Sequence, residues 1–180
     1  MHVLVTRRLT LRPPAFLDAE DIALHLSNPR VARMLVRVPH PYGVADSVRW
    51  MRSLTARPDG LVYTIHRERL IGVVSVEIGE EGPRLGYWLG EPWHGRGFMT
   101  EAAGALLAHA FQSRGYPAIR SSVFVDNPAS LRVQAKLGFE VTGAGEAWSM
   151  SRREKVQKWE TRLTAEAFSE SLQPSRKSAA

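Results

Sequence analysis

The stretch Leu85-Gly-Tyr-Trp-Leu-Gly-Glu-Pro-Trp-His-Gly-Arg-Gly-Phe-Met-Thr-Glu-Ala102 decides the fold of this chain. Its apolar start, residues 85–89, predicts a strand that Pro92 ends, and apolar residues at helical spacing then predict a long helix. The loop 94–97 joins the two. Glycines just before a helix let main-chain amides converge on one point, where the helix dipole favours negative charge. The stretch therefore predicts a protein that holds a phosphorylated cofactor beside a strand end.

This loop differs from the two common phosphate-binding motifs. A P-loop needs a lysine and a hydroxyl after its second glycine, and Arg96 and Gly97 stand at those positions, so no side chain would ligate magnesium. A dinucleotide fingerprint needs a third glycine, where this chain has Thr100. A strand-to-helix turn that binds nothing is the alternative, because short glycine loops before helices are common.

The rest of the chain alternates between strand and helix patterns. We expect helices over residues 18–27, 29–35, 44–57, 98–114 and 128–137, with Asp18 and Asn127 as N-caps. We expect strands over residues 9–12, 61–66, 70–78, 85–89, 118–125, 139–141 and 158–163. These elements predict one α/β domain over residues 1–168, with a single mixed sheet and helices on both faces. Polar residues and Pro174 predict a flexible tail over residues 169–180.

Composition narrows the class of protein. The 180 residues are 44% hydrophobic, which fits one folded domain of ordinary size. There is no cysteine, which excludes disulfides, thiol nucleophiles and thiolate metal sites. No segment approaches the roughly 20 apolar residues that span a bilayer, so we expect a cytoplasmic protein without a membrane partner. A homodimer is left open.

The chain is basic, with a net charge of +6 and a pI of about 10.2. Part of the excess lies in residues 151–158 and at Arg176 and Lys177, without an RNA-binding or helix-turn-helix signature. We interpret this charge as a solvated surface, which would also attract an anionic cofactor or a site on the ribosome. We do not expect nucleic acid as a partner, although a nucleic-acid-binding protein is the competing interpretation of the charge.

Several motifs in chain order resemble those of one family. They are Arg8-Leu-Thr-Leu-Arg-Pro13, Leu70-Ile-Gly-Val-Val-Ser75, His94-Gly-Arg-Gly-Phe-Met99 with Thr100-Glu-Ala102, Asn127-Pro-Ala-Ser130 and Lys136-Leu-Gly-Phe139. The chain is similar to the GNAT superfamily of N-acetyltransferases over about residues 6–165, and within it to the ribosomal-protein N-terminal acetyltransferases RimJ and RimL. The resemblance implies a mostly antiparallel sheet with a splayed strand pair. It also implies direct acetyl transfer from acetyl-CoA to a primary amine, without a metal.

The resemblance also implies a cofactor site. The pyrophosphate would bind main-chain amides of the loop and helix start, namely His94, Gly95, Arg96, Gly97, Phe98, Met99 and Thr100. Trp88 and Leu89 of the splayed strand would lie beside the thioester, because pantetheine amides can pair with an exposed strand edge. Asn127 would cap its helix and contact the pantetheine. Glu101, in the first turn of the long helix, is explained by the helix dipole.

A transferase of this kind needs a base, because an amine is mostly protonated at neutral pH. Glu77 is the candidate: it lies near the end of its strand and shares a face with Ser75 through period-two spacing. Glu80 and Glu81 are the fallbacks, and a solvent-facing strand residue is the alternative interpretation of Glu77. His40 and His66 show no partner spacing for zinc.

The departing thiolate needs a proton or a hydrogen bond. Many family members place a tyrosine seven residues after the asparagine, but this chain has Gln134 there. Ser130 is the better candidate, since the RimL-like branch uses a serine at this point. A polar residue in the first turn of a helix is its structural alternative.

The acceptor is the least determined part of the reaction. In the family the amine enters between the N-terminal helices and the C-terminal hairpin, here about residues 28–45 and 143–158. Trp50, Trp148 and Tyr42 would line that entrance or pack in the core. A peptide α-amine is the expected acceptor, and a small metabolite, a polyamine or an antibiotic amine stays open. Another donor such as succinyl-CoA, or a CoA-binding regulatory module without catalysis, is the alternative function.

Overall fold

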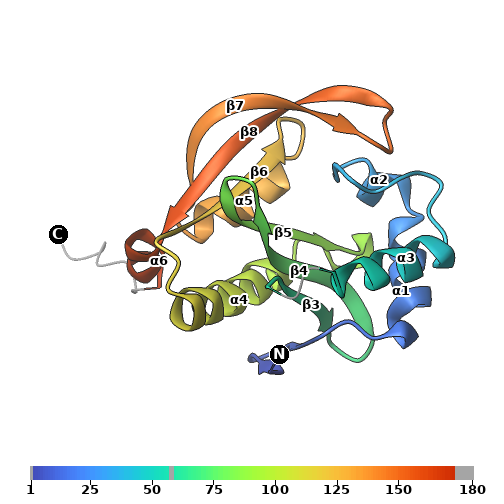
Figure 1. Ribbon diagram of the computed structural model, residues 1–180, viewed down its shortest axis with the longest axis horizontal. Coiled ribbons are helices and arrows are strands. Elements are labelled where there is room, and N and C mark those ends of the chain that lie inside the picture. Colours follow the sequence, from blue (N-terminus) through green and yellow to red (C-terminus); the bar gives the residue numbers. More distant parts are fainter. Residues whose placement is uncertain (1, 57–58, 173–180) are drawn as a thin grey trace.

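A computed structural model describes residues 2–56 and 59–172 of the chain (Figure 1). The strands are β1 (Leu4–Val5), β2 (Thr10–Arg12), β3 (Leu61–His66), β4 (Leu70–Gly79), β5 (Gly82–Leu89), β6 (Ala118–Phe124), β7 (Glu140–Ser149) and β8 (Glu154–Thr164). The helices are α1 (Ala19–Leu26), α2 (Pro29–Ala32), α3 (Val44–Leu54), α4 (Phe98–Arg114), α5 (Pro128–Lys136) and α6 (Ala165–Ser171), with short 3-10 turns η1 (Phe16–Asp18) and η2 (Glu91–Trp93). None of the described helices is long and apolar enough to cross a membrane.

One sheet runs through the whole domain. Its strands lie in the order β1-β2-β3-β4-β5-β6-β8-β7. Within the described residues, six of the seven neighbouring pairs are antiparallel, and β5 with β6 is the parallel one. This confirms the predicted mixed, mostly antiparallel sheet.

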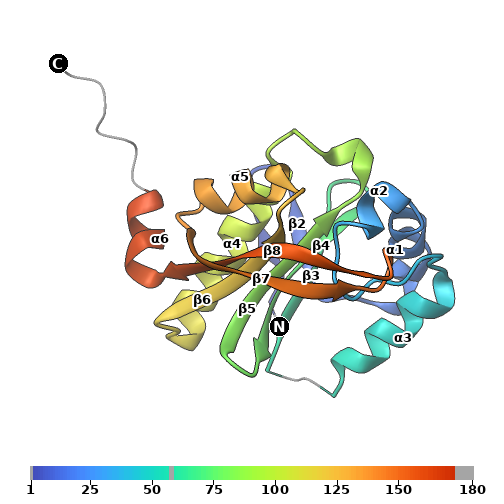
Figure 2. The same cartoon turned by 90° about the horizontal axis from the view of Figure 1, so that it is seen from above.

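Helices cover both faces of the sheet (Figures 1 and 2). On one face, α4, α5 and α6 contribute Leu106, Val133 and Phe168 to the main apolar cluster. On the other, α1 and α2 contribute Ile22 and Val31 to a second cluster, and α3 packs beside α1. The prediction of helices on both faces is therefore confirmed.

The sheet opens between its two parallel strands. β4 and β5 pair over eight positions, whereas β5 and β6 share the single pair Arg84 with Arg120. Beyond Arg84, β5 continues to Leu89 with no further strand pairing to β6 among the described residues, and Ser121 Oγ of β6 donates to the Leu85 carbonyl at 2.9 Å. The predicted splayed pair is present, and it leaves one edge of β5 available for main-chain hydrogen bonds.

The C-terminal strands are much longer than the sequence predicts. Strands were expected over residues 139–141 and 158–163, but β7 and β8 form a hairpin of ten and eleven residues. Most of β7 is exposed and it contains Gly143 and Gly145, so it lacks the alternating apolar pattern that indicates a strand. Its ladder with β8 supplies the stability that its own sequence does not show.

Two ends of elements also differ from expectation. Asp18 precedes α1, but its carboxylate caps the preceding turn at the Ala15 amide and pairs with Arg12 instead of capping the helix. α2 ends at Ala32, three residues before the expected Leu35. Helix α6 extends into the expected tail as far as residue 171, and residues 173–180 of that tail lie outside the described part of the chain.

Candidate active site

The loop between β5 and α4 is shaped by two glycines with positive φ. Gly95 has φ 73° and Gly97 has φ 75°, in a region that costs residues with a Cβ about 1–2 kcal/mol. No atom within 4 Å would meet a Cβ at Gly95, so the backbone conformation, not a lack of space, favours glycine there. Helix α4 starts directly after Gly97, and its first amides have no partner within the helix. The residues present therefore fit a diphosphate.

The side chains of the loop mainly pack against the protein and stabilise the conformation of the loop. Phe98 and Met99 are buried in the main cluster, so only their main-chain amides could contact a ligand. The Nε2 atom of His94 lies 2.8 Å from the Leu89 carbonyl oxygen. Because a carbonyl oxygen only accepts, Nε2 donates, and His94 ties the loop back to the end of β5. Arg96 is exposed, with its guanidinium 5.7 Å from the centroid of the Trp93 ring.

A network that sequence reasoning missed lies beneath this loop. The Glu101 carboxylate accepts hydrogen bonds from the Thr6 hydroxyl at 2.7 Å, the Arg8 amide at 2.9 Å and the Arg8 Nε at 2.6 Å. Arg8 also donates to the Arg96 carbonyl at 3.1 Å and lies over the Phe98 ring. Burial would raise the pKa of Glu101, but the hydrogen bonds from Thr6 and Arg8 outweigh it and lower that pKa. Glu101 therefore anchors the N-terminal segment under the β5–α4 loop.

Replacing Glu101 with glutamine should lower the free energy of unfolding by about 1–2 kcal/mol at pH 7, since hydrogen bonds to a charged group are lost. A carboxylate whose folded pKa is depressed stabilises the fold above its unfolded pKa, and this contribution disappears as the pH falls through the folded pKa. Urea unfolding at pH 7 and at pH 3 measures both values. Glu154→Gln, at an exposed position on β8, is the control. An equal loss at both pH values would contradict a role for the charge.

The exposed edge of β5 lies next to the β5–α4 loop. Leu89 is buried in the main cluster, whereas Trp88 points to the opposite face, where its ring lies 6.2 Å from that of His25. The side chain of Trp88 is thus packed against the α1 side of the sheet. The Gly90 amide bonds to the Ile71 carbonyl at 2.9 Å, so in the alternating β4–β5 ladder the main chain of Trp88 faces Val73 of β4, and that of Leu89 faces the splay.

Glu77 lies on the face of β4 opposite α4. Ser75 Oγ donates to Glu77 Oε1 at 3.2 Å, as their predicted common face requires. An Arg37 Nη2 atom lies 3.8 Å from the same carboxylate oxygen, and 22% of the Glu77 side chain is exposed. In the register, Ser75 pairs with Gly86 and Glu77 with Arg84. The carboxylate is held, partly shielded, beside a stretch of β5 that has no side chain at Gly86.

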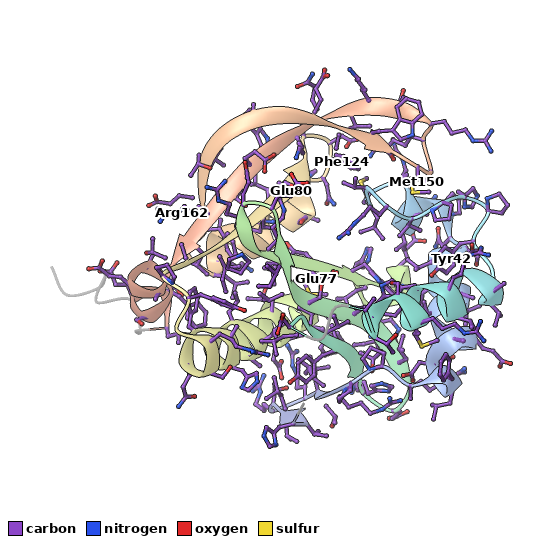
Figure 3. All side chains as sticks on the ribbon, in the orientation of Figure 1. Tyr42, Glu77, Glu80, Phe124, Met150 and Arg162 are labelled. Atoms are coloured by element: carbon purple, nitrogen blue, oxygen red, sulfur yellow. The ribbon has the colours of Figure 1, made fainter. Side chains whose placement is uncertain are left out.

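The two fallback residues lie farther out, on the β4–β5 turn. Glu80 is exposed there, and Figure 3 shows it at the turn while Glu77 lies on the sheet. Glu81 pairs with Arg120 at 2.6 Å and lines a polar cavity of about 280 Å³ together with Arg162. Of the three carboxylates, Glu77 alone lies beside Ser75.

Ser130 and Asn127 lie at the start of α5. The Asn127 Oδ1 atom accepts from the Ser130 amide at 3.1 Å, which confirms Asn127 as the N-cap. The Ser130 hydroxyl lies 2.8 Å from the phenol oxygen of Tyr87. Gln134 is buried, donates to Ser121 and accepts from Thr161.

The turn at the tip of the β7–β8 hairpin is bonded to the segment that follows α2. Met150 donates its amide to the Val36 carbonyl at 3.0 Å, and Arg152 Nε donates to the Arg33 carbonyl at 2.7 Å. Arg152 also pairs with Asp126, and the hydrogen bonds from Arg152 lower the pKa of that carboxylate against the effect of burial. Figure 3 shows Met150 at this tip. The two predicted walls of the acceptor entrance therefore meet at this turn.

The aromatic side chains predicted at the entrance divide between core and surface. Tyr42 is buried in the second cluster and Trp50 packs against it, whereas Trp148 is 57% exposed on the hairpin. His66 bonds to the Thr64 hydroxyl, and burial, followed by the Arg12 charge, lowers its pKa. Among the residues that the structure describes, no group of three or more histidine or acidic side chains could hold a metal ion.

Comparison with known proteins agrees with this geometry. Residues 8–140 match the model of the acetyltransferase (GNAT) domain. The chain is 30% identical over 150 residues to the uncharacterized N-acetyltransferase YoaA of Bacillus subtilis, covering 78% of this chain and 84% of YoaA. It is 35% identical over 86 residues to the ribosomal-protein-serine acetyltransferase of Escherichia coli, covering 46% of this chain and 48% of that protein.

Solved structures share the fold. The ribosomal L7/L12 α-N-protein acetyltransferase RimL, solved in complex with coenzyme A, superposes with a TM-score of 0.75 at 20% identity, covering 92% of this chain and 99% of RimL. The loop with two left-handed glycines, the splayed strand and the family match over residues 8–140 agree with one another. The chain belongs to the acetyltransferase (GNAT) family and is an acetyl-CoA-dependent N-acetyltransferase.

Proposed function

We propose that the chain transfers the acetyl group of acetyl-CoA to the α-amine of a peptide N-terminus, with Glu77 as the base and Ser130 as the hydrogen-bond donor to the departing thiolate. One observation carries the proposal. Glu77 lies on the face of the sheet opposite α4, and Ser130 lies on the α4 face. The splay between β5 and β6 is, within the described residues, where the sheet opens between these faces. Amine and thioester would therefore meet in the splay from opposite sides.

The cofactor would occupy the α4 side. Main-chain amides from Gly95 to Thr100 would bind the diphosphate, and the open edge of β5 that ends at Leu89 would pair with the pantetheine amides. Asn127 would contact the same arm from the start of α5. Backbone amides need no metal to hold a phosphate, because the helix dipole and the N–H groups supply the positive potential.

An α-amine suits this site better than a lysine side chain. An α-amine has a pKa of about 8, so about one molecule in ten is already neutral at pH 7. A lysine amine, with a pKa of about 10.4, costs a further ~3 kcal/mol to deprotonate. The similarity to the ribosomal-protein-serine acetyltransferase and to RimL points to the same class of acceptor.

An acceptor panel tests the proposal. Release of the thiol of coenzyme A would be followed with peptides that carry a free N-terminus, with N-blocked peptides that contain lysine, and with a polyamine. We expect turnover with the free α-amines and little with the others. Turnover restricted to lysine or polyamine would contradict the acceptor class. Binding of acetyl-CoA by calorimetry without thiol release from any acceptor would favour a regulatory module, and faster transfer from succinyl-CoA would change the donor.

A further inference from the structure

Gln134 stands where many family members have a tyrosine, but it is not available to donate a hydrogen bond to the sulfur of coenzyme A. It is 1% exposed. Its Nε2 donates to Ser121 Oγ at 3.0 Å, and its Oε1 accepts from the Thr161 hydroxyl at 2.7 Å. Turning it toward the splay would remove the acceptor of the buried Thr161 hydroxyl, at about 1–3 kcal/mol, and the donor to Ser121 Oγ, which would keep only its own bond to the Leu85 carbonyl. Gln134 is therefore a structural link between α5 and the strands β6 and β8.

A different tyrosine reaches the start of α5. Tyr87 projects from β5 toward the α4 face, and its phenol oxygen lies 2.8 Å from Ser130 Oγ and 3.1 Å from the Ser130 carbonyl oxygen. Tyr87 stands three residues beyond Arg84, the last residue of β5 that pairs with β6. The phenol therefore bridges from β5 to α5 where the two strands have separated, next to the predicted path of the pantetheine.

Hydrogen-bond roles follow from the protons available. Burial raises the pKa of Tyr87, and the hydrogen bonds with Ser130 and Gln134 only partly offset it. The phenol thus keeps its single proton at neutral pH. Two acceptors lie within reach of that proton, the Ser130 carbonyl at 3.1 Å and the closer Ser130 Oγ at 2.8 Å. When the phenol donates to Oγ, the hydroxyl hydrogen of Ser130 is free to point at another acceptor.

We propose that Tyr87 is a positioning residue, which orients the Ser130 hydroxyl toward the departing sulfur of coenzyme A. This inference rests on the role proposed above for Ser130. No proton leaves Tyr87 in this arrangement: the carbon–sulfur bond breaks, its electron pair stays on sulfur, and Ser130 donates a hydrogen bond to the thiolate. Tyr87 contributes by holding Ser130 in the donating orientation.

The thiol of bound coenzyme A tests the proposal without any acceptor. A hydrogen bond to a thiolate favours the charged form and lowers the thiol pKa. Ultraviolet titration of the thiolate in the complex with coenzyme A should give a pKa at least about 0.5 unit higher in Tyr87→Phe than in the wild type, and a similar increase in Ser130→Ala. An unchanged thiol pKa in Tyr87→Phe would overturn the proposal, even if no acceptor is ever found.

A double-mutant cycle on acetyl transfer gives the second readout. Tyr87→Phe should lower kcat about 5- to 10-fold, leave the KM for acetyl-CoA within about 2-fold, and cause no further loss in a Ser130→Ala background. If the kcat losses of the two single variants multiply in the double variant, the positioning role is overturned. If the wild type transfers no acetyl group, the proposed function is contradicted but the role of Tyr87 is not. The titration of the thiol still tests that role.

Tyr63 offers a matched control. It is a fully buried tyrosine on β3 whose hydroxyl has no hydrogen-bond partner among the described residues. Tyr63→Phe removes the same atom as Tyr87→Phe, and we expect an unchanged thiol pKa and kcat. Because it removes an unpaired buried hydroxyl, the free energy of unfolding should stay equal or rise. A change in thiol pKa as large as that in Tyr87→Phe would show that any lost hydroxyl disturbs the site, and would overturn the specific role.

Discussion

Valine at position 97 is expected to weaken acetyl-CoA binding by about 100-fold, or about 2.7 kcal/mol. Gly97 has φ 75° at the start of α4, a region that is a strong outlier for a β-branched residue. A Cβ there would come no closer than 3.5 Å to Arg8, so the cost arises from the backbone and not from a clash. The loop would relax to negative φ and turn its amides away from the diphosphate. Isothermal titration calorimetry measures the loss.

Gly115 provides the matched control for this prediction. It ends the same helix with φ 62°, and nothing lies within 4 Å of its Cβ position. Gly115→Val should therefore lower the thermal stability about as much as Gly97→Val does, but bind acetyl-CoA like the wild type. Equal affinity losses in the two variants would mean that general destabilisation, not the geometry of the loop, controls binding.

Replacement of Glu77 with glutamine should lower kcat by about 100-fold at pH 7, the low end of what a general base contributes. Glutamine keeps the shape and can still accept from Ser75, but it cannot take a proton from the amine. The KM for acetyl-CoA should stay nearly constant, because the predicted cofactor contacts lie on the opposite face of the sheet. Steady-state kinetics with a peptide acceptor measures both values.

The pH dependence makes this prediction specific. An α-amine loses its proton near pH 8, so the deficit of Glu77→Gln should shrink above that pH, where the acceptor needs no base. Glu68→Gln, in the exposed β3–β4 turn, should match the wild type throughout. A constant deficit from pH 7 to pH 9.5 would argue that Glu77 shapes the site without taking the proton. A larger loss of kcat in Glu81→Gln than in Glu77→Gln would instead assign the role of the base to Glu81 on the β4–β5 turn.

Features determined by neighbours along the chain could be predicted from the sequence. The ends of α4 follow from Gly97 and Gly115, and the start of α5 follows from Asn127 and Pro128, since caps and left-handed turns depend on a few adjacent residues. The common face of Ser75 and Glu77 follows from the period of a strand. The mixed sheet and the glycine conformations of the β5–α4 loop could therefore be predicted from local rules and family motifs.

Contacts between distant segments were decided only by the tertiary structure. Sequence spacing does not show that Glu101 binds Arg8 across 93 residues, or that Tyr87 reaches Ser130 across 43. The full length of β7 could not be predicted from the sequence either. An exposed strand is stabilised by its partner strand and not by its own apolar pattern. A hydrogen bond depends on position in space, and strand pairing alone brings these segments together.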